Sequence, residues 1–162
     1  MKKLFLSCLF FLAVSALKAQ TLTLKELNDF FEWKDTTKID NILAQRAWVY
    51  MSSEVENGDQ VDIWMYEKQQ GHVVQGMFVL VSNANNASPA HNQAVLHLLS
   101  MQQFATLQSE ASQSGYSFFK QDKSSATKQS DYWKSDKRLL VFTTDRESQL
   151  PYKVMIANIS KR

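Results

Sequence analysis

The spacing of hydrophobic residues along the chain changes twice, and the changes predict helices that alternate with strands. Between Thr23 and Gln45, apolar residues recur every three or four positions, as on one face of a helix. Thr23 and Glu26 form the sequence signature of a capping box, which marks a helix start. From Arg46 to Val81, the apolar residues are β-branched or aromatic and form three runs of strand length. This part of the chain predicts two short helices followed by an antiparallel meander.

The same order of elements recurs after the polar segment 83–93. A helical period begins after Ser100, and runs of strand length follow between residues 116 and 159. We therefore expect an α+β fold, in which an antiparallel β-meander carries short helices on one face. The repeated order suggests two tandem halves, 21–82 and 94–160, whose aromatic positions align at an offset of 68 residues.

The N-terminus has the pattern of a secretory signal peptide. Lys2 and Lys3 precede an apolar run over residues 4–17, and small residues follow up to Ala19. The run is shorter than the ~20 apolar residues that a membrane anchor needs. We therefore expect residues 1–19 to be cleaved during export and the mature domain, 20–162, to be periplasmic or secreted with no transmembrane segment.

Removal of this leader changes the charge and the cysteine content. Lys2, Lys3 and Lys18 leave with it, so 18 basic groups become 15 against 16 acidic groups, and the net charge changes from +2 to −1. A mature chain without a basic excess does not predict a nucleic-acid partner. The only cysteine, Cys8, also leaves, so we expect no disulfide bond in the mature protein.

No motif predicts a catalytic residue, a metal ligand or a cofactor. The chain has three histidines, and their spacing matches no metal site: His72, His91 and His97. The mature chain also lacks a nucleophile elbow. Two carboxylate pairs could still converge across a hairpin as an acid–base couple, although their position near a turn favours solvated side chains: Glu54 with Glu56, and Asp59 with Asp62.

Charge is distributed unevenly between the two parts of the mature chain. Residues 20–100 carry 5 basic and 10 acidic groups, whereas residues 101–162 carry 10 basic and 6 acidic groups. Charge complementarity between two packed halves is the simpler interpretation. A homo-oligomer formed through the opposite charges is the alternative.

Aromatic residues supply the first candidate binding surface. Trp48 and Tyr50 alternate with Val49 and Met51 in one predicted strand, and Trp64 and Tyr66 alternate with Ile63 and Met65 in the next. Alternate residues of a strand point to opposite faces, so both faces of this sheet would be apolar. We expect the compact Val, Ile and Met side chains to face the helices. The candidate binding platform is then made of four aromatic residues: Trp48, Tyr50, Trp64 and Tyr66.

A basic and aromatic segment supplies the second candidate surface, formed by Tyr132, Trp133, Lys134 and Arg138. Cations interleaved with aromatic rings could bind an anionic glycan or a lipid headgroup. Nearby aspartates dilute the charge, and a solvated hairpin is the simpler interpretation.

The order of elements over residues 21–160 resembles that of secreted β-lactamase-inhibitor-like proteins and of small outer-membrane assembly lipoproteins. The resemblance rests on architecture and not on a shared motif. The inhibitors carry disulfides and the lipoproteins carry a cysteine at the leader junction, and neither feature is expected here. No functional residue is therefore carried over.

The sequence favours a non-catalytic, exported binding protein of the bacterial envelope, which presents an aromatic sheet face to a protein or an envelope polymer. A small hydrolase or isomerase with a cone-shaped α+β pocket is the main alternative. A pocket that joins a histidine with a carboxylate would favour the enzyme. A structural envelope component is the third interpretation.

Overall fold

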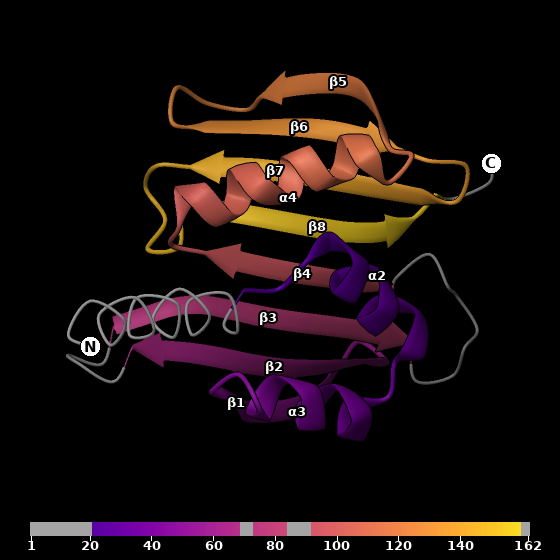
Figure 1. Cartoon of the computed structure of the whole chain (residues 1–162), viewed down its shortest axis with the longest axis vertical. Coiled ribbons are helices and arrows are strands. Elements are labelled where there is room, and N and C mark those ends of the chain that lie inside the picture. The colour runs from indigo at the N-terminus through magenta and orange to yellow at the C-terminus, as the bar shows by residue number, and fades with distance from the viewer. Residues whose placement is uncertain (1–20, 69–72, 84–91, 160–162) are drawn as a thin grey trace, which may run out of the picture.

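The computed structural model describes residues 21–68, 73–83 and 92–159. In these residues, three helices lie on one face of one eight-stranded sheet, and all neighbouring strands are antiparallel (Figure 1). The α+β class and the antiparallel sheet expected from the sequence are confirmed. The predicted signal peptide, residues 1–19, lies outside the described residues and stays a prediction.

Short polar side chains begin the helices, which are α2 (Leu24–Trp33), α3 (Thr36–Ala44) and α4 (Met101–Gln113). The hydroxyl of Thr23 accepts a hydrogen bond from the amide of Glu26 at 3.2 Å. Glu26 Oε2 accepts one from the amide of Thr23 at 2.9 Å, so the predicted capping box is confirmed. At α4, Ser100 Oγ accepts from the amide of Gln103 at 3.2 Å.

The eight strands follow the predicted runs of β-branched and aromatic residues. Their order in the sheet is β1-β2-β3-β4-β8-β7-β6-β5, so the first and second meanders meet where β4 pairs with β8. The bounds are β1 (Trp48–Glu56), β2 (Asp59–Lys68), β3 (Val73–Asn83), β4 (Gln93–Leu98), β5 (Ser117–Lys123), β6 (Lys128–Lys134), β7 (Arg138–Asp145) and β8 (Tyr152–Asn158).

Each half of the chain consists of a helical segment followed by four strands. Helices α2 and α3 precede β1 to β4, and α4 precedes β5 to β8. The second predicted half, 94–160, begins inside β4, although β4 pairs with β3 of the first meander. The duplication of the two halves stays a prediction.

The core fills the layer between the helices and the sheet. Phe30 of α2 packs against Phe78 of β3 with ring centroids 5.6 Å apart. Phe104 of α4 meets Phe142 of β7 edge to face at 5.5 Å. Of the helix residues that spacing assigned to the interior, Ile42 is half-buried and Met101 is exposed, and the others are buried: Leu24, Leu27, Phe30, Phe31, Ile39, Leu43, Phe104, Leu107 and Ala111.

The predicted orientation of the first two strands is wrong. Trp48 and Trp64 are 3% and 0% exposed and face the helices, whereas Val61, Ile63 and Met65 point to the other face of the sheet. Burial of a large aromatic ring gains more free energy than burial of a Val, Ile or Met side chain. Here the rings fill the space between the short helices and the sheet. The indole N–H of Trp64 keeps a hydrogen-bond partner when it is buried, because Nε1 donates to Asp40 Oδ1 of α3 at 3.1 Å.

Candidate binding surface on the open face of the sheet

The sheet has one helix-covered face and one face that no described helix covers, which we call the open face (Figure 1). The strand register places side chains on it in rows that cross the sheet. One row runs through Ile63, Val79, Val95, Met155, Val141 and Tyr132. Its side chains are mostly half-buried, because they shield one another without a covering layer.

The first meander makes the apolar part of the open face. Strand β2 contributes Val61, Ile63 and Met65, and β3 contributes Met77, Val79 and Val81. These residues lie directly opposite one another in antiparallel pairs, such as Ile63 with Val79. A continuous area of branched and sulfur-containing side chains results, which is the kind of surface that protein partners cover.

The second meander makes the open face more polar and more basic. A second row crosses it through His97, Lys153, Thr143, Ser130 and Asp122. The hydroxyls of Ser130 and Thr143 share a hydrogen bond of 2.9 Å. The pKa of His97 is lowered by its partial burial and by the positive charge of Lys153 in the neighbouring strand.

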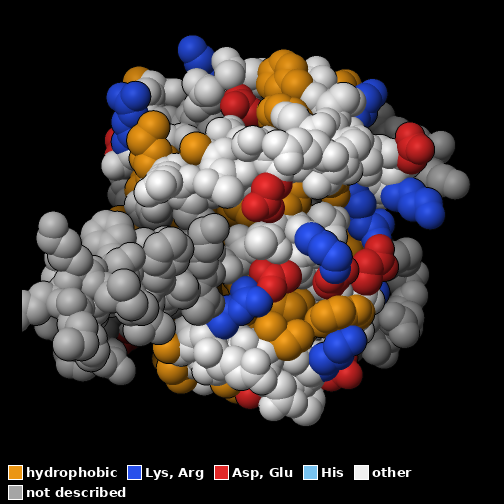
Figure 2. Space-filling model, viewed as in Figure 1, with side chains coloured by type: hydrophobic (Ala, Val, Ile, Leu, Met, Phe, Trp, Pro, Cys, Tyr) orange, Lys and Arg blue, Asp and Glu red, His pale blue; other side chains and the backbone are white. Residues whose placement is uncertain are grey.

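The opposite surface of the molecule shows a different composition. Acidic and basic side chains lie interspersed over α2 and α3, with small apolar areas between them (Figure 2). Glu110 of α4 accepts a hydrogen bond from the amide of Leu24 at 2.7 Å, so one helix caps another. Several charges on this side pair within the protein, such as Lys25 with Asp29 and Arg46 with Glu26, which makes the open face the better candidate for a partner.

The four residues of the predicted aromatic platform do come together, but Trp48 and Trp64 belong to the core and Tyr66 packs against it. Trp48 and Tyr66 have ring centroids 5.8 Å apart, and Tyr50 and Trp64 have centroids 5.3 Å apart. Only Tyr50 is substantially exposed, and its hydroxyl donates to Asp62 Oδ1 at 3.1 Å. A partner cannot reach the buried indoles of Trp48 and Trp64, so the platform as predicted is wrong.

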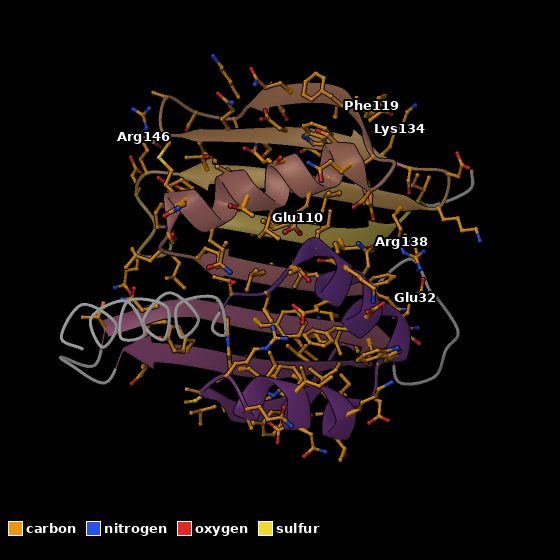
Figure 3. The ribbon with its side chains drawn as sticks, in the orientation of Figure 1. Glu32, Glu110, Phe119, Lys134, Arg138 and Arg146 are labelled. Carbon is orange, nitrogen blue, oxygen red and sulfur yellow. The ribbon has the colours of Figure 1, made fainter. Side chains whose placement is uncertain are left out.

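The predicted basic and aromatic segment is divided between the two faces. Tyr132 lies on the open face beneath Lys120 Nζ, 4.4 Å from the ring centroid. Trp133 points to the helix side, where its ring meets that of Phe142 at 6.2 Å. Lys134 Nζ lies 4.7 Å from the ring of Phe119, and Figure 3 shows the two residues side by side.

Arg138, the fourth residue of that segment, stabilises the fold. Its guanidinium lies 4.6 Å from the ring of Phe31 and forms an ion pair with Glu32, both in α2 (Figure 3). It also donates to Asn158 Oδ1 at 2.7 Å. These contacts tie α2 to β7 and β8, because one planar cation can stack and donate at the same time.

Of the two carboxylate pairs considered for acid–base chemistry, Glu54 and Glu56 are both exposed on β1, and Asp59 with Asp62 does not fit that role. Asp59 and Asp62 lie on opposite faces of β2, since they are three residues apart in a strand. Asp62 is buried and accepts hydrogen bonds from Thr36 Oγ1 at 2.9 Å and from Gln60 Nε2 at 2.9 Å, besides the one from Tyr50. Its bonds join α3 to β1 and β2, which makes it a structural carboxylate.

Two of the three histidines, His72 and His91, lie outside the described residues. The part of the chain that the structure describes contains no group of three metal-ligating side chains and no helix with the length and hydropathy of a membrane span. Sequence reasoning expected two apolar faces but assigned the Val, Ile and Met side chains to the helix side, and it missed Lys153. The alternation of polar residues with apolar ones in the last strands is the signal that could have indicated Lys153. Comparisons with protein-family models, with curated proteins and with solved structures found no match to this chain.

Proposed function

We propose that this protein is a non-catalytic binding protein of the bacterial envelope that contacts a protein partner through the open face of its sheet. The carrying observation is the uncovered apolar area of β2, β3 and β4. An antiparallel sheet that is packed on one face normally has polar side chains on the other. Here the second face carries Ile63, Val79 and Val95 in one row.

The chemistry of the face defines the partner. Its apolar part favours an apolar patch on the partner, and its other end carries Lys120, Lys128, Lys134 and Lys153 against Asp122 and Asp145. An acidic rim next to an apolar centre would match this distribution. Burial of about 800 Å² per partner is typical of a stable complex.

Export is part of the proposal and rests on the sequence of the leader. Its charged start, short apolar run and small residues at the end are the three parts of a signal peptide. The resemblance to β-lactamase-inhibitor-like proteins and small outer-membrane assembly lipoproteins agrees with an exported, non-catalytic role. That resemblance rests on the order of the elements alone.

The geometry favours binding over the hydrolase or isomerase alternative. The enzyme would need a histidine and a carboxylate that converge in one pocket. His97, the described histidine, lies opposite Lys153 instead, and its lowered pKa follows from burial and from that positive charge. A structural envelope component would be recognised by tight membrane association without a soluble partner.

Photo-crosslinking from two defined positions tests the proposal. A photoreactive residue at Val79 lies in the centre of the open face, and one at Met101 lies on α4, where the native side chain is 68% exposed. In extract of the protein's own envelope, we expect one partner to be captured from position 79 and not from position 101. Equal capture from both positions, or capture from position 101 alone, would contradict the proposal.

A further inference from the structure

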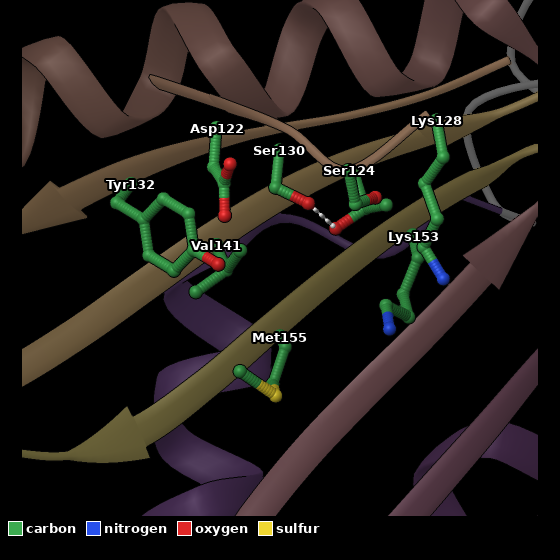
Figure 4. A pocket seen from close by; sticks show the side chains of 9 residues that line it. Asp122, Ser124, Lys128, Ser130, Tyr132, Val141, Lys153 and Met155 are labelled. Carbon is green, nitrogen blue, oxygen red and sulfur yellow. Dashed lines mark hydrogen bonds between the residues drawn. The ribbon is translucent and has the colours of Figure 1, made fainter. Parts of the chain in front are cut away.

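A pocket of about 330 Å³ opens on the second meander, on the same side as the open face (Figure 4). Its size is that of a site for one small molecule. Strands β6, β7 and β8 form its floor, and the end of β5 with the following turn forms a wall. The lining includes Asp122, Lys128, Ser130, Tyr132, Thr143 and Lys153.

One end of the pocket is cationic. The side chains of Lys128 and Lys153 lie together there (Figure 4). Lys128 Nζ has a carboxylate partner, Asp145 Oδ2, at 3.7 Å, whereas Lys153 forms no ion pair or hydrogen bond with the described part of the chain. Burial lowers the pKa of Lys153, and the charge of Lys128 lowers it further. Two cations that share one carboxylate leave a positive charge that a bound anion would neutralise.

The remaining lining is suited to a hydroxylated ring. Ser130 and Thr143 present a pair of hydrogen-bonded hydroxyls in the middle of the pocket. Asp122 lies at the end away from the two lysines, and its carboxylate has no partner among the described residues (Figure 4). A carboxylate at this place accepts hydrogen bonds from hydroxyls and repels a second negative charge. Tyr132 supplies an aromatic wall.

From this arrangement we propose that the pocket binds one acidic sugar unit. Its carboxylate or phosphate lies between Lys128 and Lys153, its hydroxyls meet Ser130 and Asp122, and its ring packs against Tyr132. A carboxylate and a phosphate both offer negatively charged oxygens to the two lysines, so either group fits the cationic end of the pocket. This site goes beyond the proposed function, because it takes a small ligand and needs no protein partner.

Calorimetric titration of the mature protein with four probes tests the site: glucuronate, glucose 6-phosphate, glucose and inorganic phosphate. We expect saturable binding of at least one acidic sugar, and the tighter one identifies the anionic group. Glucose, which lacks the charge, and inorganic phosphate, which lacks the ring, are expected to bind at least about tenfold more weakly. Equal binding of glucose or of inorganic phosphate would overturn the proposal, as would the failure of both acidic sugars to bind.

Matched variants locate the binding on the protein. Lys153→Gln should weaken the binding of the acidic sugar about tenfold or more, because it removes one of the two cations at that end of the pocket. Lys137→Gln makes the same change of charge in the exposed turn between β6 and β7 and should leave the affinity unchanged. Asp122→Asn, at an exposed residue of β5, should also weaken binding without unfolding the protein. Equal weakening by Lys137→Gln would show a nonspecific charge effect and would contradict the site.

The photo-crosslinking tests the protein-binding proposal, and the titration tests the pocket, so the two proposals can be refuted separately. Loss of sugar binding with partner capture intact at position 79 would refute the pocket alone. Sugar binding without any captured partner would refute the protein-binding proposal alone.

Discussion

Trp64 Nε1 of β2 donates a hydrogen bond to Asp40 Oδ1 of α3 at 3.1 Å. This bond fixes which side of β2 lies beneath the helix. The Trp64 ring is fully buried and lies 5.5 Å from the ring of Phe78 in the neighbouring strand. Because residues alternate along a strand, the burial of Trp64 places Ile63 and Met65 on the open face. The proposed binding surface thus depends on this tryptophan.

Replacement of Trp64 should therefore cost stability. We expect Trp64→Phe to lower the free energy of unfolding by about 2–4 kcal/mol, since it leaves a cavity and removes the bond to Asp40. Trp33→Phe is the matched control, because Trp33 is 37% exposed at the end of α2, and it should cost less than about 1 kcal/mol. Urea denaturation followed by circular dichroism measures both. Equal losses would mean that Trp64 is not in the core.

The close approach of Trp48 to Gly76 gives a second prediction. A Cβ at Gly76 would lie 3.0 Å from Trp48 Cη2 and 3.4 Å from the carbonyl oxygen of His97. Gly76→Ala should destabilise the protein by about 1–3 kcal/mol, because the indole cannot withdraw from a packed core. In a Trp48→Phe background, which lacks the contacting ring atoms, the same substitution should cost less. A double-mutant cycle by denaturation measures the difference, and strict additivity would refute the contact.

Glu26 gives a prediction about acid stability. Burial alone would raise its pKa, but hydrogen bonds from Arg46 and Thr23 outweigh this effect, and its pKa lies below the ordinary value of 4.5. A carboxylate with a lowered pKa in the folded state contributes stability above its unfolded pKa, and this contribution is lost as the pH falls through the folded pKa. Glu26→Gln should thus reduce stability by about 1 kcal/mol at neutral pH and flatten the decline below about pH 4.5.

Glu54→Gln on β1 is the control for the acid prediction, because Glu54 is exposed. Denaturation curves at neutral and acid pH measure both variants. An acid decline in Glu26→Gln as steep as in the wild type would show that the Arg46–Glu26 pair does not contribute to it.

The sequence predicted the elements of the fold but not the orientation of the sheet. Local signals determine the elements: Thr23 with Glu26 begins a helix, and alternation identifies the strands. The orientation depends on which set of side chains fills the space between the helices and the sheet, and this is a property of the tertiary structure. Alternation separated Trp64 from Ile63 correctly, yet both sets are apolar, so the pattern alone could not say which one faces the helices.

The candidate pocket was beyond sequence reasoning for a related reason. Asp122, Ser130, Thr143 and Lys153 belong to four different strands, and the register that aligns them in one row is set by strand pairing. In the sequence, the four residues lie far apart, and no local pattern indicates that they share one pocket. Arg138 shows the converse: its position beside aromatic residues suggested a binding surface, whereas its contacts are with Phe31 and Glu32 of a distant helix.

The affinity of the captured partner for two glutamate variants tests the role of the open face most directly. Val79→Glu places a charge in the apolar centre of the open face, and Met101→Glu places the same charge on exposed α4. We predict that Val79→Glu raises the dissociation constant about tenfold or more, while circular dichroism shows a folded protein and Met101→Glu binds like the wild type. An unchanged dissociation constant for folded Val79→Glu would contradict the proposal that partners bind the open face.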